Sequence, residues 1–195
     1  TSDQPVSVYM LNYYLHTADA SLVYPTQTNG SDYFVSAYAE ILGGEFLIVA
    51  TADNTEVEIT PSATTYGGNP AGTTFNVTLD EGECYLVQSS GNLTGSRITG
   101  TAPPEDCKKF AVFSGAVCTN VGGCAACDHL VEQMPPITTW GLNFVTVPYK
   151  TRVSDYFQVI AAEDNTTFYV NSIPYMLNAG QNMGLTFGDA RYISS

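Results

Sequence analysis

The chain has 195 residues, of which 44% are hydrophobic, and with 13 Tyr and 9 Phe it can bury a core, so it is not a disordered polypeptide. It carries 19 acidic and six basic residues, a net charge of −13, and such a surface repels both nucleic acid and anionic membranes. No apolar run approaches the ~20 residues of a membrane-spanning helix, so we expect no membrane insertion.

Short segments rich in β-branched and aromatic residues, separated by Gly, Asn, Asp and Pro, follow one another through the first part of the chain, and each predicts a strand. These segments are Val6–Met10, Tyr33–Tyr38, Glu45–Ala50, Glu56–Thr60, Thr74–Leu79, Cys84–Gln88, Arg97–Thr99 and Phe110–Gly115. Strands spaced about 8–12 residues apart predict an all-β fold of antiparallel sheets.

Cysteines dominate the next segment, since four of the five lie between Cys107 and Cys127. Such dense cysteine usage is typical of an oxidising, extracellular compartment. Because Cys107 and Cys118 flank a strand of about ten residues, ~33 Å long, they cannot bond each other. We expect a Cys118–Cys127 disulfide, then a Cys84–Cys107 disulfide, with Cys124 left odd.

Two other interpretations of this connector (residues 118–135) stay open: a zinc site made by three cysteines and His129, and a reactive Cys–His pair. In the disulfide interpretation, Asp128, His129 and Glu132 form local contacts that fix the crossover. The residues from Asp128 to Met134 can form one or two helical turns at most. Trp140 follows a double proline and is expected to pack at the junction.

The remaining strands repeat the earlier ones at a constant offset. Pro25–Ile59 aligns without gaps to Pro136–Val170 with nine identities, and such a self-match indicates a duplicated unit. The strands predicted in this second copy are Asn143–Pro148, Tyr156–Ala161, Thr167–Asn171, Tyr175–Leu177, Met183–Phe187 and Tyr192–Ile193. We therefore predict two tandem, jelly-roll-like β-sandwiches, residues 25–135 and 136–195, of which the second lacks its last strand.

The repeated tripeptide Asp-Asn-Thr lies between two predicted strands in both copies, at Asp53 and Asn54 and again at Asp164 and Asn165. Asp and Asn tolerate left-handed backbone conformations, so each tripeptide predicts a hairpin turn. Their oxygens are also suitable ligands for calcium, but each turn offers too few of them, so we expect no cofactor.

Residues 1–24 have no earlier copy, and they begin with a strand of the kind that the second repeat lacks. We expect this segment to complete the second repeat, either within its own chain or in a neighbouring one. An open strand edge invites addition of another chain, so the second case predicts a self-assembling filament or array subunit.

The run Phe110-Ala-Val-Phe-Ser-Gly115, then Cys118-Thr-Asn-Val, then Cys127-Asp-His-Leu-Val-Glu-Gln-Met-Pro-Pro136 and Trp140-Gly141 resembles the IgGFc-binding family. The cysteine spacing is more similar to its bacterial cell-surface branch. The resemblance implies a β-rich, secreted or surface-displayed module that is not an enzyme.

No catalytic constellation stands out, because His16 and His129 are the only histidines and no Gly-x-Ser-x-Gly, phosphate-loop or His-Glu-x-x-His motif occurs. We predict an extracellular surface module that acts in adhesion or as a structural component, through contacts with proteins or glycans. The alternatives are the self-assembling subunit and a carbohydrate-active accessory module.

Overall fold

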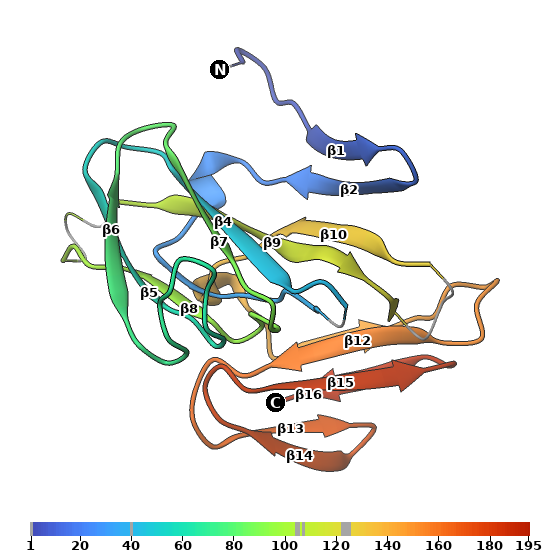
Figure 1. The fold of residues 1–195 in the computed structure, drawn as a ribbon. Coiled ribbons are helices and arrows are strands. Elements are labelled where there is room, and N and C mark those ends of the chain that lie inside the picture. Colours follow the sequence, from blue (N-terminus) through green and yellow to red (C-terminus); the bar gives the residue numbers. More distant parts are fainter. Residues whose placement is uncertain (1, 40, 104–105, 107, 122–125) are drawn as a thin grey trace.

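The computed structural model describes residues 2–39, 41–103, 106, 108–121 and 126–195. The described chain is all-β, as predicted, with strands β1 to β16 and the short 3-10 helices η1 (Thr26–Thr28) and η3 (Ile137–Thr139). In these residues no helix has the length and hydropathy needed to cross a membrane. Figure 1 shows the early strands at the top of the molecule and the C-terminal strands below them.

The first unit is a sandwich of two four-stranded antiparallel sheets. Its strands are β3 (Asp32–Phe34), β4 (Gly44–Ala50), β5 (Thr55–Thr60), β6 (Phe75–Leu79), β7 (Cys84–Gln88), β8 (Arg97–Gly100), β9 (Phe110–Thr119) and β10 (Asp128–Gln133). One sheet has the order β10-β9-β4-β7 and the other the order β3-β8-β5-β6. Alternate residues of β4, including Phe46 and Ile48, point into a shared core with Val57 and Ile59 from β5 and Phe110 from β9.

The second unit is smaller. Its strands are β11 (Asn143–Thr146), β12 (Asp155–Ile160), β13 (Thr166–Val170), β14 (Ile173–Leu177), β15 (Asn182–Phe187) and β16 (Arg191–Ser194). They form a four-stranded sheet, β11-β16-β13-β14, and a pair, β12-β15. Phe168 and Ile193 belong to a separate core, against which Val159 and Leu185 of the β12-β15 pair are packed.

The strand pairings in the two units follow the same order. β3 pairs with β8 and β4 with β7 in the first unit, as β11 pairs with β16 and β12 with β15 in the second. The two units differ at one edge. β4 also pairs with β9, whereas β15 is the one strand that pairs with β12 in the described part of the chain.

The N-terminal residues form a hairpin of their own, in which β1 (Val8–Tyr14) pairs with β2 (Thr17–Val23). Figure 1 shows this hairpin, in blue, above β10, and β2 contacts β10. This differs from our expectation that residues 1–24 complete the second repeat of the same chain, because the hairpin lies against the first unit. Completion of a neighbour's repeat stays a prediction.

Candidate functional site

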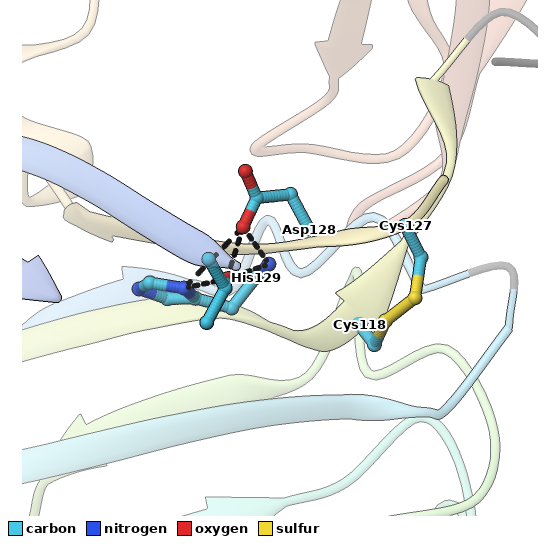
Figure 2. The surroundings of a disulfide bond; sticks show 5 residues. Cys118, Cys127, Asp128 and His129 are labelled. Carbon is cyan, nitrogen blue, oxygen red and sulfur yellow. Dashed lines mark hydrogen bonds and ion pairs between the residues drawn. A yellow bond between two sulfur atoms is a disulfide. The ribbon is translucent and has the colours of Figure 1, made fainter. Parts of the chain in front are cut away.

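A disulfide closes the tip of the β9-β10 pair, as the cysteine spacing predicted. Cys118 and Cys127 are bonded across a sequence separation of 9, with their Cα atoms 5.4 Å apart. Figure 2 shows the bridge where β9 ends and β10 begins, with Asp128 and His129 next to it. The bond uses two of the four ligands that a zinc site here requires. Cys124 lies outside the described residues.

The second expected disulfide, Cys84–Cys107, is not present. Cys84 has a free, exposed thiol at the start of β7. In the sheet, β4 separates β7 from β9, the strand that Cys107 precedes in the sequence. Cys107 itself lies outside the described residues.

Asp128 and His129 contact the N-terminal hairpin. The Thr17 hydroxyl donates to the Asp128 carboxylate and lies 2.8 Å from His129 Nδ1. The same carboxylate accepts the His129 N–H at 3.0 Å. These bonds, above all the one from Thr17, stabilise the ionised carboxylate and lower the pKa of Asp128. Asp128 and His129 thus make the predicted local contact and, in addition, a contact with β2, a strand that is remote in the sequence.

Side chains of β2 cap the outer edge of β10. The Asp19 carboxylate accepts the Val131 N–H at 2.8 Å, and the Ser21 hydroxyl accepts the Gln133 N–H at 3.2 Å. One step earlier along both strands, the Thr17 hydroxyl oxygen lies 3.3 Å from the backbone nitrogen of His129. Alternate residues of β2 thus supply the acceptors that a neighbouring strand backbone supplies in a regular sheet.

This capped strand was not predicted from sequence. The residues from Asp128 to Met134 were allowed one or two helical turns at most and were assigned no strand, whereas they contain β10. β2 was missed entirely, and the signal that identifies it is the alternation Thr17-x-Asp19-x-Ser21, whose partners are remote in the sequence.

Glu132 lies near Asp19 at a small cavity of about 290 Å³ that also borders Ser36 and Gln158. Ser36 Oγ donates to Gln158 Oε1 at 2.6 Å and so joins the two units. The surrounding protein removes some of the water around Glu132, and the negative charge of Asp19 adds to this effect, so the pKa of Glu132 is raised.

The two Asp-Asn-Thr turns make the same bonds. Asp53 Oδ1 accepts the Glu81 N–H at 3.1 Å, and Asp164 Oδ1 accepts the Ala179 N–H at 3.1 Å. Asn54 and Asn165 have positive φ, as expected of such turns. They are not hairpin turns, however, because β4 and β5 belong to different sheets, as do β12 and β13. Each turn carries the chain from one sheet of a sandwich to the other.

Trp140 lies at the junction between the units. Its Nε1 donates to the Pro135 carbonyl at 3.1 Å, and its ring centroid lies 6.3 Å from that of Phe34 on β3. The side chain thereby links the segment that enters the second unit to the first unit.

The second unit exposes apolar side chains at positions that the first unit buries. Tyr33 is 1% exposed and its ring packs against Phe110 of β9, with ring centroids 5.4 Å apart. Phe144, its counterpart in the repeat alignment, is 51% exposed. We call this region the open face; it also includes the exposed side chains of Leu142, Val145, Val147, Tyr149 and Val153.

The side chains of the open face are aromatic and aliphatic. In the described part of the chain, no three His, Cys, Asp or Glu side chains gather into a group that could hold a metal ion. Exposed aromatic and aliphatic side chains provide apolar area that a partner can cover.

The fold is that of an all-β, disulfide-bonded module with exposed apolar side chains in its second unit. The family model described as IgGFc binding protein matches residues 19–195, and the chain belongs to this family. It is 33% identical over 175 residues to the human IgGFc-binding protein, covering 86% of this chain and 3% of that protein. The chain thus spans only a small part of this relative. No solved structure matches it.

Proposed function

We propose that the chain is an extracellular module that binds other proteins at its open face and serves in adhesion or as a structural part of the cell surface. Membership of the IgGFc-binding family supports protein binding, and the exposure of Phe144 is the observation that supports this face as the binding surface. Aromatic residues are enriched in the centres of protein interfaces. This role requires no catalytic group.

The name of the human relative supplies the first probe, the Fc fragment of immunoglobulin G. Binding is measured by biolayer interferometry with Fc, with a panel of mucins and matrix proteins, and with a glycan array. We expect saturable binding to a protein on this panel. The variant Phe144→Ser should weaken it by at least tenfold, because a central aromatic anchor is worth about 1.4 kcal/mol or more.

Tyr66→Ser is the matched control, because Tyr66 is an exposed aromatic residue on the loop between β5 and β6, in the first unit. This control should bind as the wild type does. Equal loss in both variants places the binding surface elsewhere, and an absence of binding across the whole panel contradicts the proposal. Binding to the glycan array alone favours a carbohydrate-binding accessory module instead.

A further inference from the structure

The small cavity beside Glu132 lies where the N-terminal hairpin, the first unit and the second unit meet. Its volume is about 290 Å³, and its walls come from β2, β9, β10 and β12 and from the segment that follows β3. This volume is at the lower end of the ~300–1,000 Å³ of ordinary ligand sites, so the cavity suits one small molecule or one side chain of a partner. The described residues that line it include none from the open face, so the two surfaces are distinct.

Two carboxylates make the cavity acidic. Asp19 from β2 and Glu132 from β10 both line it, and no basic side chain is among the described residues that do so. The three arginines of the chain form ion pairs elsewhere, each with an aspartate outside the cavity. The negative charge of the cavity is therefore not neutralised by a side chain in its described lining.

The two carboxylates differ in their hydrogen bonds. Asp19 Oδ1 accepts the Ala20 N–H and Asp19 Oδ2 accepts the Val131 N–H, both at 2.8 Å. The Glu132 side chain makes no hydrogen bond or ion pair with the described residues, and its pKa is raised by the loss of water and by the charge of Asp19. Folding thus disfavours the ionised Glu132 carboxylate, and no bond within the described chain offsets this. Acidic groups in such surroundings are common in binding sites.

Two tyrosines add aromatic surface to the cavity. Tyr38 and Tyr156 both line it, and their ring centroids lie 4.7 Å apart. Tyr38 has a positive φ of 43°, a conformation that is unfavourable for residues other than glycine. Gly184 of β15 leaves room for the Tyr156 ring, because a Cβ atom at that position would overlap the phenol oxygen. Aromatic rings attract ammonium groups through the negative potential of their faces.

These features match an organic cation better than a metal ion. Calcium requires six to eight oxygen ligands, and both Asp19 oxygens already accept backbone N–H groups. Glu132 alone offers a carboxylate with no bonded partner in the described chain. A single carboxylate beside aromatic rings is suited to an ammonium group on a carbon stem, which needs one negative partner and apolar contact.

We infer that this cavity binds an alkylammonium group, of the kind carried by a lysine side chain or by a free primary amine. The ammonium group pairs with the Glu132 carboxylate, and the carbon stem packs against Tyr38 and Tyr156. Asp19 adds to the attraction, because its charge remains after its hydrogen bonds are formed. Since the walls of the cavity come from both units, the ligand contacts both of them. The inference adds a second binding site to the module and does not depend on the open face.

Binding is measured on the 195-residue chain by amide proton–nitrogen correlation NMR during titration with n-butylammonium chloride at constant ionic strength. We expect saturable shifts with a Kd of about 1 mM, largest at the amides of Gly115, Glu132 and Gln158. n-Butanol lacks the charge and ammonium chloride lacks the stem, so each should bind at least about fivefold more weakly. An absence of saturable shifts with n-butylammonium overturns the inference, as does equal binding of n-butanol.

The decisive variant is Glu132→Gln, which retains the shape of the side chain and removes its charge. It should weaken n-butylammonium binding about five- to tenfold, because the ammonium group loses a charged hydrogen-bond acceptor. Glu81→Gln is the matched control, since Glu81 is an exposed residue between β6 and β7 that does not line the cavity. It should bind as the wild type does, and so should Phe144→Ser of the open face. Equal weakening in Glu132→Gln and Glu81→Gln overturns the inference.

Two further probes identify the source of the ammonium group and exclude a metal ion. A short capped peptide with one central lysine presents the group on a protein backbone. Tighter binding of this peptide than of n-butylammonium supports a lysine of a partner protein, and the reverse order supports a free amine. Calcium chloride is the opposing probe. Saturable shifts of the same amides with calcium, and none with n-butylammonium, overturn the inference and indicate a metal site instead.

Discussion

Removing the Cys118–Cys127 disulfide tests whether this bond stabilises the folded state. The bridge closes a loop with a sequence separation of 9, and its effect on the entropy of the unfolded chain is worth about 2.6 kcal/mol at 25 °C. For a chain of this length, that loss corresponds to a decrease in Tm of about 5–10 °C. We therefore expect the double variant Cys118→Ser, Cys127→Ser to unfold at lower urea concentration than the wild type.

The assay is urea unfolding followed by tryptophan fluorescence, with and without reductant. Reductant should lower the stability of the wild type to that of the double variant and leave the double variant unchanged. Cys84→Ser is the matched control, because Cys84 is a free, exposed thiol, and it should be neutral. A loss below about 1 kcal/mol in the double variant, or a similar loss in the control, refutes the reasoning.

Further predictions concern two titrating groups, Tyr33 and Glu132. Tyr33→Phe removes the hydroxyl that accepts the Gly30 N–H and donates to the Phe110 carbonyl, both at 2.7 Å, and should cost about 1–3 kcal/mol in urea unfolding, whereas Tyr66→Phe should cost nothing. Because burial raises the pKa of Tyr33 to about 12, the wild type should lose about 2 kcal/mol between pH 10 and 12, since the phenol ionises at lower pH in the unfolded chain than in the folded one; an equal loss in Tyr33→Phe contradicts this. Glu132→Gln should raise stability at pH 7, because the raised pKa means that folding disfavours the ionised carboxylate. The gain should be less than about 0.5 kcal/mol, because Glu132 is an exposed residue and solvent screens its charge. That gain should vanish below the ordinary Glu pKa, where the folded and unfolded states are both protonated, and a gain that persists at pH 3 in a thermal melt contradicts it.

Most strands of the first unit were predicted because each strand shows its own alternation of apolar and polar residues, which can be recognised without knowing its partner strand. The alternation in Glu45–Ala50 reflects a strand with one buried face, and the structure extends it by one residue to Gly44. The Cys118–Cys127 pairing was also predictable, since both residues flank one short connector.

Pairings between distant segments were not predictable in this way. The turns at Asp53 and Asp164 were correctly recognised as turns but wrongly assigned to hairpins, because nothing local says which sheet the next strand joins. The same holds for β2 and β10. Their mutual contact depends on bonds from Thr17, Asp19 and Ser21 to backbone groups that are remote in the sequence. The periodicity of a single segment does not indicate such a contact.

The position of the bridge has a mechanical consequence. When tension pulls the second unit away from the first, β10 is loaded from its Gln133 end and peels toward Cys127. The bridge stops this unravelling, because the chain between Cys118 and Cys127 cannot lengthen beyond the 5.4 Å that separates their Cα atoms. Fully extended, that stretch would add about 25 Å more. In an oxidised module the extension therefore ends once β10 is peeled, whereas a reduced one also releases the stretch between the two cysteines.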